Sequence, residues 1–194
     1  VGHAILLDGK PLHTPGKAPL VLPRRALADA VAAEWAAQED MVAPHTMPFT
    51  RTANSAIDNV ALNHAEIAAM IAEYGETDLL CYRAEGPAEL IARQCADWDP
   101  LQDWAAEALD APLATGVGVI HVPQPRVALS GSLGIGLAAL TRQRPPDALW
   151  ALARIDETWQ AEQWGEDDIA AADAAGKRAA FLHAAQVLER LESA

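Results

Sequence analysis

The segment from Arg154 to Asp167 concentrates tryptophans, acids and amides, which a plain helix does not need. At about 100° per residue, four polar residues fall on one helix face: Asp156, Gln160, Gln163 and Asp167. Trp159 lies on one flank of this face and Trp164 on the other. Such a strip can bind a protein surface. The alternative is a solvated polar face with both tryptophans turned into the core.

Acid-base or metal chemistry has weaker support. A carboxylate pair such as Glu157 and Asp167 could exchange protons, but acids this numerous are typical of solvated surface. The six histidines, at positions 3, 13, 45, 64, 121 and 183, lie singly, and none is three or four residues from another as helical metal ligands would be. The Gly-x-Ser-x-Gly elbow of serine hydrolases is absent. We therefore expect no enzyme activity and no metal.

The glycine-rich run from Gly131 to Gly136 precedes an apolar helix pattern. It lacks the Lys-Ser/Thr ending that places a charge on phosphate, so we interpret it as a close contact between helices. We expect no nucleotide and no other cofactor.

Composition excludes further classes of function. Asp and Glu outnumber Lys and Arg by 27 to 14, which gives a net charge of −13, and no run of basic residues provides a patch for nucleic acid. No stretch reaches the roughly 20 apolar residues of a membrane span. The two cysteines, Cys81 and Cys95, are too few and too far apart for a disulfide scaffold. These features predict a soluble protein of a reducing compartment, without membrane insertion.

The N-terminal part is β-rich. Two predicted strands, at 4–7 and 10–14, flank Asp8-Gly9, a pair suited to a tight hairpin turn, and a third strand is predicted at 19–22. A helix is predicted at 24–38, with Trp35 holding it to the sheet. Residues 41–50 contain Pro44 and Pro48 without periodicity and predict a loop.

The rest of the chain predicts a helical bundle, with helices at 63–74, 88–109, 130–141, 146–164 and 167–191. Residues 117–122 predict a short strand without an evident partner. The fold class is therefore α+β: a small N-terminal α/β domain of residues 1–62, with a hairpin-rich sheet and a helix, followed by a mainly helical domain of residues 63–194.

Two further segments carry aromatic or charged residues. Trp98 and Trp104 lie among acids, and we expect both rings in the bundle core because exposed tryptophan is costly. The segment from Thr77 to Arg83 places an acid and an arginine around an apolar centre. It suits either a buried ion pair that joins two elements or a groove wall.

An ordered series of phrases runs through almost the whole chain. The most distinctive are Leu7-Asp8-Gly9-Lys10-Pro11, Glu34-Trp35-Ala36-Ala37-Gln38, Met47-Pro48, Thr77-Asp78-Leu79-Leu80-Cys81-Tyr82-Arg83, Trp98-Asp99-Pro100, Gln124-Pro125, Trp159-Gln160 and Trp164-Gly165-Glu166-Asp167. Together they resemble the alpha-subunit-specific assembly chaperones of the F-type ATP synthase, often called the ATP-twelve family.

The resemblance implies a chaperone and not an enzyme. Members hold the isolated alpha subunit of the catalytic head until the beta subunit replaces them, so the expected partner is the alpha subunit. Seven residues are implied as client-binding or as the scaffold of the binding surface: Glu157, Trp159, Gln160, Gln163, Trp164, Glu166 and Asp167. Trp35 and Arg83 are second-tier candidates. The expected state is a monomer, cytoplasmic in a bacterium and mitochondrial in a eukaryote.

Two other functions, the role of Glu166 and the completeness of the sequence stay open at this point. The protein could be a small hydrolase or metal-dependent enzyme that uses the acidic helix with His121 or His183, or a general helical adaptor. Glu166 could contact the client or cap the helix that begins near Asp167. The chain starts at Val1, and the stretch between Gln124 and Ser130 is shorter than the family pattern. This member is therefore either shortened or lacks residues there and before Val1.

Overall fold

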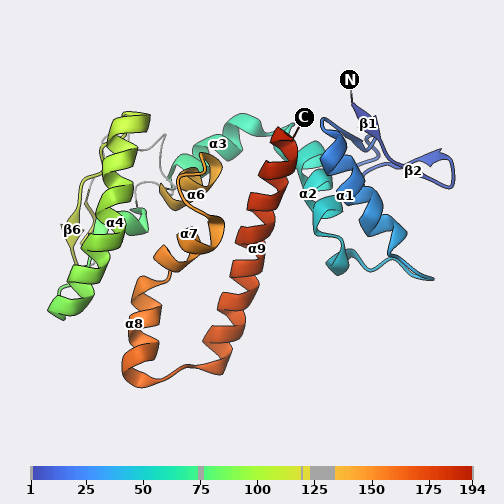
Figure 1. The fold of residues 1–194 in the computed structure, drawn as a ribbon. Helices are drawn as coiled ribbons and strands as arrows, with labels where there is room; N and C mark the ends of the chain where they lie inside the picture. The colour runs from blue at the N-terminus through green and yellow to red at the C-terminus, as the bar shows by residue number, and fades with distance from the viewer. Residues whose placement is uncertain (1, 74–76, 119, 123–133, 194) are drawn as a thin grey trace. The chain divides into compact units, whose positions relative to one another are not determined.

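The computed structural model describes residues 2–73, 77–118, 120–122 and 134–193 (Figure 1). The chain divides into two compact units. Unit 1 contains the residues up to Ile67 together with those from His183 onward, and unit 2 contains Ala68–Leu182. These units are defined by contacts, whereas the predicted boundary between residues 62 and 63 separates two folding domains. That boundary stays a prediction.

The strands of unit 1 are short. β2 (Leu6–Leu7) and β3 (Lys10–Pro11) form an antiparallel hairpin, whereas β1 (His3–Ala4) pairs with β4 (Val21–Leu22). Asp8 and Gly9, with φ of 50° and 78°, supply the left-handed angles of the hairpin turn, which confirms the predicted turn. The predicted strand at 4–7 is split at the buried Ile5, whose N–H donates to Leu20 O while its carbonyl accepts from Leu12 N.

The first helix, α1 (Arg25–Ala36), agrees with the predicted helix to within two residues at its ends. The loop prediction for residues 41–50 holds for residues 41–43 and is wrong for most of the remainder. Pro44–Thr46 form a 3₁₀ turn (η1), and α2 (Pro48–Ser55) continues as a π-helical turn, η2 (Ala56–Val60).

The cause of this error is a cap supplied by another helix. Glu34 of α1 accepts hydrogen bonds from Phe49 N, Thr50 N and Thr50 Oγ1, each at 2.7 Å. A carboxylate there satisfies the unpaired N–H groups of the first turn of α2, and Pro48 fits the first helical position. The sequence near residue 48 carries no cap of its own.

The core of unit 1 lies between its strands, α1 and α2. It contains Ile5, Leu20, Leu22, Leu27, Ala28, Val31, Ala53 and Val187. Val187 comes from the C-terminal part of α9 (Asp168–Glu192). Trp35 is half-buried against this cluster, on the side of α1 that packs inward.

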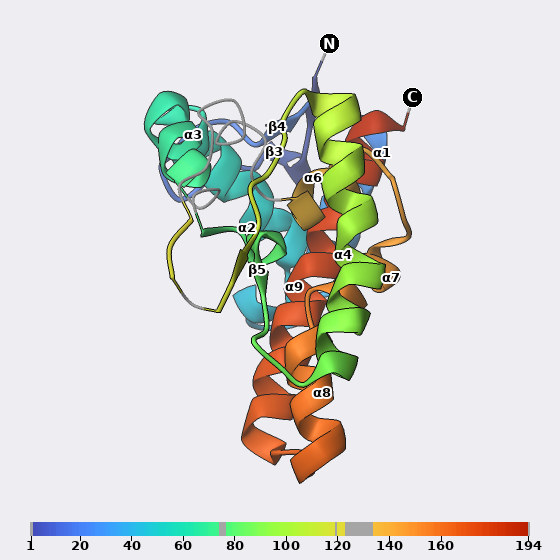
Figure 2. The ribbon, with the colours of Figure 1, turned by 90° about the vertical axis from the view of Figure 1, so that its left-hand side faces the viewer.

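Unit 2 is built around α4 (Ala88–Leu109), which has the predicted bounds and runs beside α6 (Gly134–Leu140) and α8 (Ile155–Trp164) (Figure 2). β5 (Tyr82–Arg83) pairs in parallel with β6 (Gly116–Val117). A 3₁₀ turn, η4 (Leu79–Cys81), directly precedes β5. The strand predicted at 117–122 is thus shorter, because Gly118, with φ of 77°, donates to Arg83 O and ends it.

The other helices of unit 2 follow the prediction in part. The start of the helix predicted at 130–141, the proposed glycine contact before Gly134 and the Gln124–Ser130 stretch lie outside the described residues. The helix predicted at 63–74 is present as α3 (His64–Glu73). Tyr74 also lies outside the described residues. In the described part of the chain, no helix combines the length and apolar character of a membrane span.

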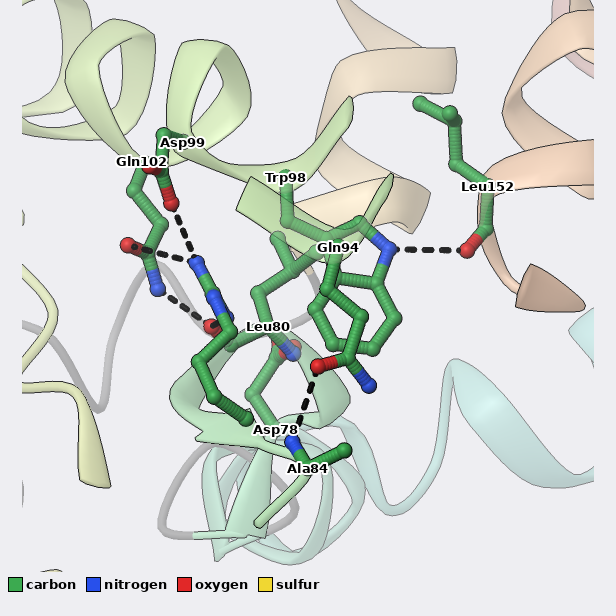
Figure 3. Close-up of polar contacts among 9 residues, drawn as sticks. Asp78, Leu80, Ala84, Gln94, Trp98, Asp99, Gln102 and Leu152 are labelled. Atoms are coloured by element: carbon green, nitrogen blue, oxygen red, sulfur yellow. Dashed lines mark hydrogen bonds and ion pairs between the residues drawn. The ribbon is translucent and has the colours of Figure 1, made fainter. Parts of the chain in front are cut away.

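The helix predicted at 146–164 is broken into α7 (Pro146–Leu152) and α8. In a continuous helix, Leu152 O would accept from Asp156 N. Instead it accepts from the indole Nε1 of Trp98 at 2.9 Å (Figure 3). The chain turns at Ala153 and Arg154, so α8 starts in a new direction.

The core of unit 2 confirms the expectation for Trp98 and Trp104. Trp98 is fully buried, and Trp104 packs partly buried against the same cluster. Arg83 is buried too, and donates to Asp99 Oδ1 at 2.5 Å and Leu80 O at 2.7 Å, with its guanidinium 5.1 Å from the Trp98 ring centre. Arg83 thus forms an ion pair that joins two elements, but its partner is the half-exposed Asp99 of α4 and not Asp78 of the same segment. Asp78 instead accepts from Leu80 N and Gly134 N.

Candidate functional site

A helical hairpin at the far end of α8 gathers most of the predicted site. We define it as α8, the link Gly165–Asp167 and the unit 2 part of α9, residues 168–182. Figure 1 shows α8 and α9 leading away from this link. We call residues 163–169, which comprise the link and its neighbours, the hairpin tip. Gly165, with φ of 91° and ψ of 165°, ends α8 in a conformation that favours glycine.

The start of α9 answers the question about Glu166. Asp167 Oδ1 accepts from Ile169 N at 2.8 Å and from Ala170 N at 2.9 Å, which makes Asp167 the capping residue. Glu166 is exposed and makes no hydrogen bond or ion pair with the described residues. Because Gly165 separates the two helices, the predicted single face is wrong for Asp167.

The strip on α8 is further divided by its contacts with α4. Asp156 accepts from Gln94 Nε2 at 2.6 Å. The side-chain oxygen of Gln94 accepts from Ala84 N at 2.8 Å, as Figure 3 shows. Gln94 is fully buried, so Asp156 serves to hold α8 to α4.

A charged pair fixes α8 one turn further along. Arg93 of α4 donates to both Glu162 oxygens at 3.0 Å, and its guanidinium lies 5.1 Å from the centre of the Trp159 ring. The hydrogen bond to Glu162 raises the pKa of Arg93, and the same bond lowers the pKa of Glu162. Trp159 is half-buried against the unit 2 core. Trp159 therefore packs between α8 and α4 and has a structural role.

A groove of about 680 Å³ runs between the two arms of the hairpin. Residues from both arms line it, and five of them are predicted site residues: Glu157, Gln160, Trp164, Glu166 and Asp167. Half of its other lining is alanine, from Ala161 on α8 to Ala174 on α9, and the rest is Arg154, Thr158, Glu162 and Gly165. Glu157 pairs with Arg154 at 2.8 Å at the end of the groove near α7.

The tip exposes two large apolar side chains. Trp164 is 78 % exposed and Ile169 is 83 % exposed. Gln163 is exposed beside them but does not line the groove. The alternative with both tryptophans in the core is thus wrong for Trp164, while Trp159 follows it in part.

The second-tier residues do not border this groove. Trp35 belongs to the unit 1 core and Arg83 to the buried network of unit 2. Both have evident structural roles.

Sequence reasoning missed several residues that shape the hairpin. Ile169 carried a usable signal, because it is a lone bulky apolar residue among aspartates and alanines at a helix start. Arg93 carried none, because its contacts to Trp159 and Glu162 join positions far apart in the sequence.

Nothing in the described part of the chain gathers three side chains that could hold a metal ion. His183 contacts Thr52 Oγ1 at 2.9 Å and meets the Phe49 ring edge to face, and His121 lies 3.4 Å from the Tyr82 hydroxyl. Neither contact adds support to the metal-dependent alternative.

Comparison with known proteins gives a consistent result. A sequence model of the ATP12 chaperone protein family matches residues 1–106. A solved structure of a point variant of Atp12p from Paracoccus denitrificans has 44% identity and a TM-score of 0.94, covering 98% of this chain and 92% of that one.

Two further structures agree. Atp12 from Paracoccus denitrificans has 42% identity and a TM-score of 0.90, with coverage of 97% and 91%. A candidate chaperone from Agrobacterium tumefaciens has 41% identity and a TM-score of 0.90, with coverage of 98% and 81%. The matched structures include the hairpin, which the family model does not reach. The chain belongs to the ATP12 chaperone family, as its sequence motifs indicated.

Proposed function

We propose that this protein binds the unassembled alpha subunit of the F-type ATP synthase head through the α8–α9 hairpin. It shields a surface of that subunit until the beta subunit replaces it. The observation that carries the proposal is the exposure of Trp164 and Ile169 at the tip of a hairpin whose other residues are mainly alanines, acids and amides. Family membership supplies the chaperone role.

Exposed tryptophan suits this role for a physical reason. Tryptophan is costly to leave in water and is enriched among the residues that dominate protein interfaces. The surrounding acids and amides keep the rim of the contact wet, which permits release. A holding chaperone needs no nucleotide, because the final partner displaces it by mass action.

The hairpin is also held in a way that suits binding. Its α8 arm is tied to α4 by Gln94 and Arg93, and its α9 arm is tied to α7 by the ion pair of Arg178 with Asp147. The tip itself is left uncovered by the rest of unit 2. We further propose that the protein acts as a monomer, in the cytoplasm of a bacterium or in mitochondria of a eukaryote.

The first test is aggregation of isolated alpha subunit, followed by light scattering with and without this protein. We expect suppression near equimolar ratio and a complex of one copy of each on size-exclusion chromatography. An unrelated aggregating protein should gain no comparable protection. Failure of the folded protein to bind or protect alpha would refute the proposal, and equal protection of both substrates would favour the general adaptor.

A further inference from the structure

The charges around the hairpin tip are strongly one-sided, whereas Arg154 precedes α8 and Lys177 and Arg178 lie further along α9. Between Ile155 and Gly176 the sequence contains seven acids and no lysine or arginine. Five of the seven acids already have structural partners: Glu162 pairs with Arg93, Glu157 with Arg154 and Asp173 with Lys177, Asp156 accepts from Gln94, and Asp167 caps α9. Within the described part of the chain, Glu166 and Asp168 at the tip lack such partners. Their charge is available to a bound molecule.

The groove between the arms has an alanine floor that lets another backbone approach closely. Ala161 lies on the α8 side, and Ala170, Ala171 and Ala174 lie on the α9 side. Trp164 also lines the groove and stays mostly exposed. An occupant therefore meets an apolar floor bordered by carboxylates.

The walls also restrict the backbone of the occupant. Both are α-helices, whose N–H and C=O groups are bonded within each helix and offer no strand edge. An extended segment in this groove would leave its own backbone groups unpaired against alanine, which is costly. A helix satisfies its backbone internally.

We propose that the groove receives an amphipathic α-helix of the client whose apolar face is flanked by lysine or arginine. The apolar residues, spaced by three and four, contact the alanine floor and Trp164. The basic residues lie against Glu166 and Asp168, whose charges have no partner in the described part of the chain. This inference rests on the proposed function, and it specifies which chemistry in the alpha subunit the hairpin selects.

The test compares two double variants of the full chain in titrations with isolated alpha subunit. One, the groove variant, is Glu166→Gln with Asp168→Asn, which removes the two unpartnered charges at the tip and keeps side-chain size. The matched control is Glu89→Gln with Glu107→Gln, which removes two exposed charges of α4 that do not line the groove. Far-UV circular dichroism and thermal unfolding check that both fold.

We expect the groove variant to bind roughly 2- to 30-fold more weakly, from two exposed charge pairs of about 0.2 to 1 kcal/mol each. The control should change affinity less than twofold, and the difference should shrink in about 0.5 M salt because exposed charges are screened. Equal affinities of the two variants would overturn the charge assignment while leaving the proposed function intact.

Hydrogen exchange of the alpha subunit tests the helix. In the complex with the native chain, we expect the protected segment to be a helix with lysine or arginine beside its apolar face. Protection confined to a strand, or to an acidic segment, would overturn the inference. Absence of any binding by the native chain would instead refute the proposed function, and this inference with it.

Discussion

Trp164 gives the sharpest single prediction, because its contributions to folding and to binding should separate. It lies at the end of α8 with 78 % of its surface exposed. Replacing it by alanine removes little that is packed in the free protein. It removes the largest apolar side chain that the hairpin tip offers to a partner.

The magnitude follows from area. A tryptophan buries about 150 to 250 Å², so the exposed 78 % leaves about 120 to 195 Å², worth roughly 3 to 5 kcal/mol at about 25 cal/mol per Å² if fully buried on binding. Binding never recovers the whole of such an area term, so we expect a loss of about 2 kcal/mol or more, which is roughly 30-fold or more in affinity. The buried remainder predicts a fall of about 1 kcal/mol or less in the free energy of unfolding.

The assay is a titration of isolated alpha subunit by native protein and Trp164→Ala, paired with thermal unfolding of each. A matched control is Trp98→Ala, which removes a fully buried ring and its hydrogen bond to Leu152 O, and should lower stability by about 3 to 5 kcal/mol. Native-like affinity of folded Trp164→Ala would refute the role of the tip. A stability loss as large as that of Trp98→Ala would refute the description of Trp164 as exposed.

Three further predictions concern the supports of the site and the titrating groups. Gln94→Leu should lower the free energy of unfolding by about 1 to 3 kcal/mol in thermal unfolding, because it leaves Asp156 and a backbone N–H without their hydrogen bonds; a neutral result would contradict the bridging role. Burial raises the pKa of Cys81 to about 11, and the nearby Asp78 adds to this rise. At pH 8 a thiol reagent should therefore modify the half-buried Cys95 before Cys81. Fast labelling of a Cys95→Ser variant would contradict this prediction. Burial lowers the pKa of His183 below its usual value, so the unfolded chain binds the proton more readily and stability should fall as pH drops below about 6.5. In His183→Gln, urea titrations should show a flatter pH dependence, and an unchanged slope would contradict the assignment.

The sequence predicted those parts of the fold whose determinants are local. The Asp8-Gly9 turn and the helix from Ala88 to Leu109 depend on neighbouring residues, and both are present with the expected positions. The core position of Trp98 follows from the cost of exposing its ring. The acidic, tryptophan-bearing segment also marked the region where the groove lies.

The rest depends on contacts between distant residues. The cap of α2 is Glu34, and the break between α7 and α8 comes from the Trp98 indole, so neither is visible in the local pattern. For the same reason, the predicted strip from Asp156 to Asp167 was interpreted as one helix face. The structure assigns Asp156 to a support and Asp167 to a cap, and it adds Ile169 to the exposed tip.

Displacement by the beta subunit tests the central claim most directly. A preformed complex of alpha subunit with this chain would be mixed with increasing beta subunit. The chain would carry a fluorescent label on a cysteine introduced at the exposed Glu107 of α4, which does not line the groove, in a Cys95→Ser background. Anisotropy would follow release of the labelled chain. We predict saturable release as alpha and beta associate, and no release by an equal amount of an unrelated protein. A complex that persists while beta binds alpha would contradict the claim that the hairpin shields the alpha surface that beta occupies.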